Sequence, residues 1–382
     1  MRKYLSIVTL AAAIFCGCTK NVFEPETARE EAPRYVALED VARIFAGLPI
    51  GMEQMREVHD AASESAINGY DEEYLMKDLF ESPGSGVGDS PSKAKEYSKP
   101  LRDLLREAFS TKAEDEGVRW LDSLMVSDIQ IYWPFSDSWN GTALPVITYD
   151  PGDLAASNVG YALKADGTCD KVMVDEQMAR ERPVWVINRN SDAEYKSLEM
   201  MRREDPSWGN GGGDIIVRPS SKAPADIKTL ILRSFTANRQ YDSWFAGAAE
   251  FFVKVGSVES FKASTEAELR LYNPTITDFM IVVRRKQMGQ ELPFNAVLVS
   301  EWTKSLTNCA LMIIEDDGGS RTTWKANAMV KVNSKSYGIE LELPLNSRDD
   351  VVWRGSLTRS YIEKYSGELG HFGDIDMVLE LI

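Results

Sequence analysis

The spacing of apolar residues changes once along the chain, near Asp128, and this change most limits the folds that the chain can adopt. Before that point apolar residues recur three or four positions apart, as in residues 38–48, which is the spacing of an amphipathic helix. After it, short apolar or alternating runs such as residues 129–133 are separated by turn residues, which is typical of strands. The sequence therefore predicts an α+β fold, with a small N-terminal helical region followed by mainly antiparallel, β-sandwich-like β domains.

The predicted elements divide the chain into successive regions. Helices are predicted at residues 38–48, 52–62, 74–79, 101–109 and 118–125. Strands are predicted at residues 129–133, 144–149, 172–174, 184–187, 215–217, 230–232, 251–255, 267–272, 279–284, 297–302, 310–314, 324–332, 337–343 and 377–381. We expect a signal at 1–17, a flexible tether at 18–33, a helical region at 34–126, a β-rich domain at 127–240 and an antiparallel β-sandwich-like domain at 241–382.

The first eighteen residues have the pattern of an export signal that ends in a cysteine. Arg2 and Lys3 precede an apolar run at residues 5–15, which is too short to span a bilayer of about 30 Å permanently. The residues before Cys18 resemble the lipobox of bacterial lipoproteins, with Phe15 where leucine is commoner. The resemblance implies that Cys18 becomes the lipidated first residue, carrying palmitate, and that several acyl chains anchor the protein to a membrane.

The charge of the chain limits its partners. The formal net charge is −16 and becomes more negative when Arg2 and Lys3 leave with the signal. Phosphate backbones repel such a surface, so nucleic acid is excluded as a partner. We expect contact with the membrane through the lipid at Cys18, and an envelope protein or a glycan as the further ligand.

Cysteines and histidines are few in the expected mature chain. Cys169 and Cys309 remain after the signal leaves and Cys18 is lipidated, and they form either one disulfide or two separate buried thiols. His59 and His371 are the two histidines of the chain, and both are predicted to be surface or capping residues. The sequence excludes a histidine-rich zinc site.

Two acidic turns are the strongest candidates for a ligand site. Residues 315–319 (EDDGG) and 346–350 (NSRDD) each follow a predicted strand. Calcium takes six to eight oxygen ligands, and loops at one end of a sandwich can supply them. The two turns resemble the calcium-binding loops of C2-type β-sandwich domains. The predicted cofactor is Ca²⁺, with Asp316, Asp317, Asp349 and Asp350 as ligands, and the alternative is that these residues form ordinary solvated turns.

The sequence leaves open whether the protein is an enzyme, and a binding or structural module is favoured. A glycan- or peptide-processing hydrolase needs two converging carboxylates and no histidine, so the alternative candidates are Asp137, Asp150, Asp175 and Glu176. The chain has no GxSxG motif, and the glycines at 209–213 lack the Lys-Ser/Thr of a phosphate-binding loop. Catalytic residues stay unassigned.

Aromatic residues gather at positions 132–139, where Tyr132, Trp133, Phe135 and Trp139 lie beside a turn. Exposed aromatic rings can stack on sugars, but their large apolar area more often fills a core. We therefore predict that this cluster is part of a core.

Three segments carry a resemblance to other proteins. Residues 68–74, 131–136 and 241–247 read NGYDEEY, IYWPFS and YDSWFAG. They resemble recurring segments of an uncharacterised group of Bacteroidota lipoproteins, and the likeness extends over most of the mature chain. It implies an envelope lipoprotein of the outer membrane and carries no activity. The face of the membrane stays open, because residues 19–23 separate Cys18 from the first acidic residues.

Overall fold

The computed structural model describes ten stretches of the chain, and Tyr35–Ile382 form one compact unit. The described residues are 36–81, 97–110, 114–152, 154–190, 195–204, 228–257, 275–303, 306–317, 321–332 and 335–382. The predicted signal, the tether and Cys18 lie outside these residues, as do the predicted strands at 215–217 and 267–272. No helix of the described part has both the length and the apolar character needed to cross a membrane.

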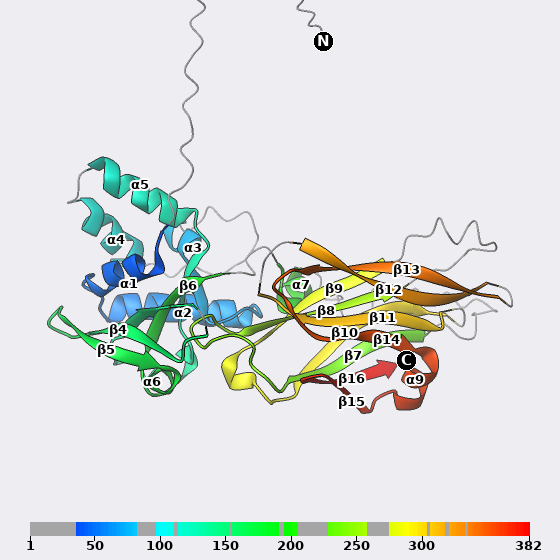
Figure 1. The fold of residues 1–382 in the computed structure, drawn as a ribbon. Helices are drawn as coiled ribbons and strands as arrows, with labels where there is room; N and C mark the ends of the chain where they lie inside the picture. The colour runs from blue at the N-terminus through cyan, green and yellow to red at the C-terminus, as the bar shows by residue number, and fades with distance from the viewer. Residues whose placement is uncertain are drawn as a thin grey trace, which may run out of the picture. The chain divides into compact units, whose positions relative to one another are not determined.

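The first part of the described chain builds a six-stranded sheet with the strand order β1-β2-β6-β3-β4-β5 (Figure 1). One pair, β3 with β6, is parallel, and the other pairs are antiparallel. Its strands are β1 (Glu73–Leu75), β2 (Ile129–Tyr132), β3 (Val146–Tyr149), β4 (Ser157–Leu163), β5 (Cys169–Asp175) and β6 (Val184–Arg189). The associated helices are α1 (Leu38–Ala46), α2 (Met52–Ile67), α3 (Met76–Phe80), α4 (Leu101–Ser110), α5 (Glu114–Met125) and α6 (Glu176–Glu181), with the short 3₁₀ helix η1 (Ser136–Ser138).

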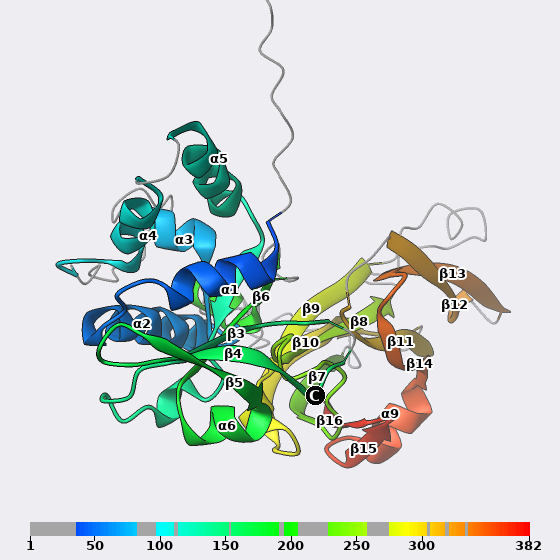
Figure 2. The same cartoon turned by 60° about the vertical axis from the view of Figure 1, so that its left-hand side comes forward.

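Helices cover one face of this sheet because their apolar stripes meet the apolar side of its central strands (Figure 2). Phe45 of α1 and Met55 of α2 are fully buried and share a core with Ile131 and Trp185. The helices of the predicted region 34–126 and the strands that follow them therefore have one common core. The opposite face carries a smaller core that includes Tyr132.

The aromatic cluster is confirmed as core. Tyr132, Trp133 and Phe135 are buried, and Trp139 is half-buried and packs edge-on against Trp133. His59 lies against the rings of Trp133 and Trp139, with centroid distances of 5.7 and 5.3 Å.

The second part of the described chain is a sandwich of two four-stranded antiparallel sheets, with the orders β10-β7-β16-β15 and β14-β11-β8-β9 (Figure 1). Its strands are β7 (Lys228–Ala237), β8 (Ala249–Ser257), β9 (Thr275–Val283), β10 (Leu292–Trp302), β11 (Asn308–Glu315), β14 (Asp350–Thr358), β15 (Leu369–Phe372) and β16 (Ile375–Leu381). The short helices are α7 (Leu198–Glu204), η2 (Arg285–Gln287) and α9 (Arg359–Tyr365). The main core lies between the two sheets, where alternate residues of each strand face inward.

A long hairpin of β12 (Arg321–Val332) and β13 (Lys335–Asn346) forms a third layer. Leu341 and Leu343 of this hairpin pack on Phe252 and Met312, which lie on the outer face of the β14-β11-β8-β9 sheet. That sheet is therefore apolar on both faces, as expected for a layer buried between two others.

The α+β class with a β-sandwich-like part is confirmed. Strands β1, β4, β14 and β15 were not predicted. Tyr74 and Leu75 were expected to begin a helix but pair in β1 with β2, and the helix α3 begins at Met76. No disulfide joins the two cysteines that remain in the described chain: Cys309 is buried and Cys169 is exposed, and both are free thiols.

Candidate metal centre

The centre of the candidate site is Glu315, the last residue of β11. In β11 the odd-numbered residues Leu311 and Ile313 face the sandwich core, and Glu315 continues this alternation opposite Phe251 of β8. Its side chain is fully buried, with 0% exposure. No N–H or hydroxyl of a described residue donates to either of its carboxylate oxygens, and its hydrogen-bond partner is another carboxyl, that of Asp242. Two buried carboxylates this close repel one another, so the pair needs a shared proton or a cation.

Asp242 reaches the same point from the loop that joins β7 to β8. The guanidinium of Arg285 holds this loop, because its Nη2 donates to the carbonyl of Asp242 at 2.9 Å and its Nε donates to the carbonyl of Gly247 at 3.2 Å. Farther along the loop, Trp244 and Phe245 are buried against the second face of the six-stranded sheet. The position of Asp242 is therefore fixed at its own carbonyl and by the buried residues that follow it.

Side chains in and next to the six-stranded sheet hold the backbone of this loop by hydrogen bonds. The side-chain amide of Asn188 donates to the carbonyls of Phe245 and Ala246 at 3.0 and 2.6 Å. The Ala248 N–H donates to the carboxylate of Asp71 at 2.8 Å. Gly247 has a φ of +138°, and a Cβ on it would lie 3.1 Å from the same carboxylate, so glycine suits this close approach.

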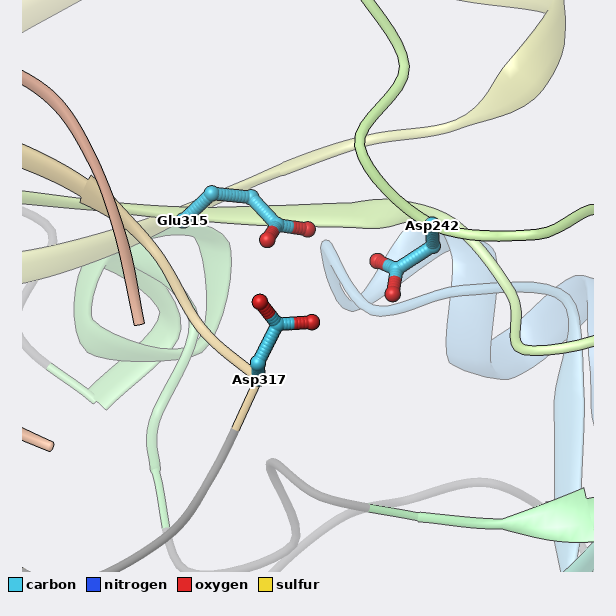
Figure 3. Close-up of side chains that lie close together, drawn as sticks. All are labelled: Asp242, Glu315 and Asp317. Atoms are coloured by element: carbon cyan, nitrogen blue, oxygen red, sulfur yellow. The ribbon is translucent and has the colours of Figure 1, made fainter. Parts of the chain in front are cut away.

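Asp317 completes a triad of carboxylates with Asp242 and Glu315. One oxygen from each of the three residues lies within 4.8 Å of the other two, and Figure 3 shows the three carboxylates turned toward one another. Glu315 is buried, Asp242 is half-buried and Asp317 is exposed, so the triad opens toward solvent on the side of Asp317. Hard cations such as Ca²⁺ and Mg²⁺ prefer such an oxygen-only set, and the triad can hold a metal ion.

The electrostatics of the triad agree with this interpretation. Burial raises the pKa of Glu315 to about 11, and the neighbouring Asp242 adds to the rise. Burial also raises the pKa of Asp242, and burial together with the charges of Asp242 and Asp350 raises the pKa of Asp317 to about 6. Without an ion, Glu315 therefore retains at neutral pH a proton that a free carboxyl loses, whereas Asp317 is mostly ionised. A divalent cation would take the place of the proton on Glu315.

The triad borders a pocket of about 190 Å³. Asp242, Asp316 and Asp317 lie on one side of it, and residues of the six-stranded sheet, including Gln130 and Arg189, lie on the other. The site therefore collects side chains that are far apart in the sequence.

The four predicted calcium ligands have different surroundings. Asp317 belongs to the triad. Asp316 is 4% exposed, lines the pocket, and accepts a hydrogen bond from the Asn346 side chain at 3.1 Å. Asp349 accepts the Asn346 N–H at 2.7 Å, and burial raises its pKa to about 6. Asp350 is exposed and lies opposite Glu315 on the neighbouring strand β14. The two predicted turns thus meet at this end of the sandwich.

Two residues of the triad were not among the predicted ligands. Glu315 belongs to the EDDGG turn, and its position on the core side of an alternating strand is a signal that could have found it. Asp242 lies in the segment YDSWFAG, about 70 positions away from the other two. No sequence pattern connects it to them, because only the path of the loop between β7 and β8 brings it there.

The candidate catalytic carboxylates do not converge. Asp137 pairs with Lys286, Asp175 caps the N-terminus of α6 through the Met178 N–H, and Glu176 pairs with Arg180. Asp150 lines the pocket beside the triad. His371 is 76% exposed and its Nδ1 pairs with Asp376, which agrees with its prediction as a surface residue.

Comparison with known protein families, with curated proteins and with solved structures finds no match for this chain. The fold and the site therefore define its class on their own: an α+β protein with a β-sandwich and a candidate acidic cation centre.

Proposed function

We propose that the protein is a lipid-anchored binding or structural module of the bacterial envelope, stabilised by a divalent cation, with Ca²⁺ as the ion, at Asp242, Glu315 and Asp317. The observation that carries the cation proposal is Glu315, which is fully buried and whose one hydrogen-bond partner among the described residues is another carboxyl, that of Asp242. An ion at this point supplies the positive charge that a buried carboxylate requires. It also connects the loop between β7 and β8 to the end of β11.

The number of carboxylate oxygens in the triad and its open side favour calcium over magnesium. Three carboxylates provide up to six oxygens, and the open side next to Asp317 admits water. Ca²⁺ accepts six to eight oxygens in flexible geometry, whereas Mg²⁺ demands a near-ideal octahedron and keeps several waters. The carboxylates come from a loop and a strand end, and such a ligand set suits Ca²⁺, which tolerates irregular coordination geometry.

The test is thermal unfolding of the full-length chain in a non-ionic detergent, with calcium and then with chelator. At a calcium concentration about one hundred times Kd, binding stabilises the folded state by about 2.7 kcal/mol, so the melting temperature rises by several degrees. The variant Asp317→Asn retains less than half of this rise. Asp170→Asn is the matched control, because Asp170 is an exposed aspartate on β5, far in sequence from the triad.

Two results would contradict the calcium proposal. The first is a melting temperature of the native chain that is the same with calcium and with chelator. The second is a calcium-induced rise in melting temperature that Asp170→Asn reduces as much as Asp317→Asn does. If calcium does not change the melting temperature, the hydrolase alternative is favoured. Asp242 and Glu315 would then be a carboxyl pair that shares a proton beside a pocket. Screening glycan and peptide substrates against the double variant Asp242→Asn/Glu315→Gln tests that alternative.

The proposed anchor is tested separately. Metabolic labelling with a palmitate analogue, followed by membrane fractionation, should show label on the native chain and none on Cys18→Ser. Label that persists in Cys18→Ser would place the lipid on another residue.

A further inference from the structure

Another pocket, of about 300 Å³, lies beside the strands β9 and β10. Each of these is an end strand of one of the two sandwich sheets. The short helix α7 contacts β9 and follows Ser197, which pairs with Met280 of that strand (Figure 1). Gly69, just after the C-terminus of α2, also lines the pocket. No residue of the carboxylate triad does, so this β9–β10 pocket is separate from the candidate metal centre.

Arg284 and Gln287 line this pocket and carry donors that the described chain leaves unused. The N–H and the Nε of Arg284 both donate to the Gln287 Oε1, at 3.0 and 3.3 Å. Because Oε1 accepts both bonds, the atom that remains on the amide is the donor Nε2. Neither this Nε2 nor the Arg284 Nη1 and Nη2 has a hydrogen-bond or ion-pair partner among the described residues. The bonds to Oε1 hold the guanidinium beside the amide, so the remaining nitrogens can bind one anion together.

Glu199 supplies the opposite charge. It belongs to α7, is half-buried and lines the same pocket. A Cβ on Gly69 would lie 2.1 Å from the Glu199 Oε2, so the carboxylate packs directly against the backbone of this glycine. Gly69 also has a φ of +82°, which glycine adopts without strain. In the part of the chain that the structure describes, no donor or cation pairs with the Glu199 carboxylate.

The two charged groups are therefore held apart within one pocket. Arg284 and Glu199 have opposite charges but form no ion pair with each other. A ligand that carries both an anionic and a cationic group can pair with both of them at once. The same pocket is lined by Ile281, Leu292 and Phe294, which give it an apolar wall. Apolar walls with a few polar groups are the usual composition of a small-molecule site.

We propose that the β9–β10 pocket binds a free α-amino acid with an apolar side chain. Arg284 and Gln287 bind its carboxylate, because a guanidinium can hold a carboxylate through two parallel hydrogen bonds. Glu199 binds its ammonium group, which has three donors and no acceptor, and Leu292 and Phe294 contact its side chain. A volume of about 300 Å³ lies at the lower end of the range of small-molecule sites, which suits a ligand of this size. The inference goes beyond the proposed function and does not depend on the divalent ion.

The test is calorimetric titration of the full-length chain, in non-ionic detergent, with leucine. Two matched ligands each lack one charge: 3-methylbutan-1-amine has no carboxylate, and 4-methylpentanoate has no ammonium group. We expect leucine to bind and each analogue to bind about tenfold more weakly or less, because one charged hydrogen-bonding group of the pocket then stays unpaired. This comparison uses the native chain, so it does not depend on how any variant folds.

Two variants test which group binds which end of the ligand. Arg284→Gln should weaken leucine binding by about tenfold and abolish the preference for leucine over the amine. Glu199→Gln should weaken it similarly and abolish the preference for leucine over 4-methylpentanoate. Arg354→Gln is the matched control for Arg284→Gln, because Arg354 is exposed on β14, at the opposite end of the sheet from β9. Asp170→Asn is the control for Glu199→Gln, and melting temperatures report whether each variant folds.

The outcomes separate this inference from the calcium proposal. Absent leucine binding, equal binding of either analogue, or an equal loss in a variant and its control would overturn the amino-acid site. Leucine should bind equally well with calcium and with chelator, because no residue of the triad lines the β9–β10 pocket. Leucine binding in a chain whose melting temperature does not respond to calcium would support the amino-acid site and contradict the calcium proposal alone.

Discussion

Strand β11 buries side chains along its whole length, yet its middle and its end have different surroundings. In the middle, Leu311 and Ile313 pack into the sandwich core, and Met312 packs under the β12–β13 hairpin. At the end, Glu315 takes the next core-facing position and is buried just as completely, but the hydrogen-bond partner of its carboxylate is another carboxyl, that of Asp242.

The difference shows that burial alone does not reveal the role of a residue. An apolar side chain is stabilised by contact with any close-packed neighbours, so the middle of β11 needs nothing more than the fold supplies. A carboxylate needs hydrogen-bond donors or a counter-charge. Where the fold buries a carboxylate next to other carboxylates, a cation from outside the chain is the natural counter-charge.

The largest expected effect comes from the middle of the strand. Ile313→Ala should lower the free energy of unfolding by about 2–5 kcal/mol, because it removes buried methyl groups and leaves a cavity. The loss should be the same with calcium and with chelator, as measured by chemical denaturation. A loss that depended on calcium would mean that the core and the triad are coupled, and the contrast between the two regions would fail.

Glu315→Gln should have the opposite effect on the calcium-free chain. The glutamine amide can donate to Asp242 and Asp317, so the buried group gains partners and the free energy of unfolding at neutral pH should rise by about 1–3 kcal/mol. The calcium-induced rise in melting temperature should disappear. Thermal unfolding in chelator and in calcium measures both. A calcium-free variant less stable than the native chain would show that the proton shared with Asp242 already satisfies Glu315.

A third prediction concerns buried carboxylates that do have donors. Glu57 accepts the Leu101 N–H at 2.7 Å, and Glu72 accepts the Phe135 N–H at 3.2 Å. Burial nevertheless raises the pKa of each to about 7. Because their pKa values are raised on folding, their stabilising contribution is complete below about pH 4.5 and is lost as the pH rises through about 7.

The free energy of unfolding, measured in saturating calcium, should therefore fall between pH 5 and pH 8. Glu57→Gln should reduce this fall by about 1–2 kcal/mol, since a glutamine side chain cannot ionise. Gln177→Glu, on the exposed surface of α6, is a control that should leave the slope unchanged. A slope that stays the same in Glu57→Gln would assign the pH dependence to other groups.

The sequence predicted most of the architecture because local patterns determine it. The apolar spacing of residues 38–48 and the alternation of residues 310–314 involve only residues close in sequence. The structure has the helix α1 and the strand β11 at these positions. Strand β14 was missed, because its burial pattern is mostly exposed or intermediate and apolar alternation gives little signal there. The parallel pairing of β3 with β6 is a long-range contact that no local pattern contains.

The candidate site was predictable only in part, for the same reason. The acidic turns pointed to Asp317, which joins the triad. Asp242 was not found, because it reaches the triad through the docking of Trp244 and Phe245 on another sheet. Which carboxylate is buried without a donor depends on the three-dimensional packing around it, and a composition rich in acidic residues conceals such a group among many solvated ones.

The smallest expected effect distinguishes the triad from the acidic residues around it. Asp350 lies opposite Glu315 in the register of β11 and β14, and its charge adds to the rise in the pKa of Glu315, but its own side chain is exposed. Asp350→Asn should therefore relieve a screened repulsion and stabilise the calcium-free chain by a few tenths of a kcal/mol, about the size of an exposed charge interaction. Most of the calcium-induced rise should remain, in contrast to Asp317→Asn. Because Asp350 acts on Glu315 only through its charge, added salt should diminish this stabilisation. If Asp350→Asn instead lost the calcium-induced rise in melting temperature as completely as Asp317→Asn, Asp350 would be a ligand and the triad would extend onto β14.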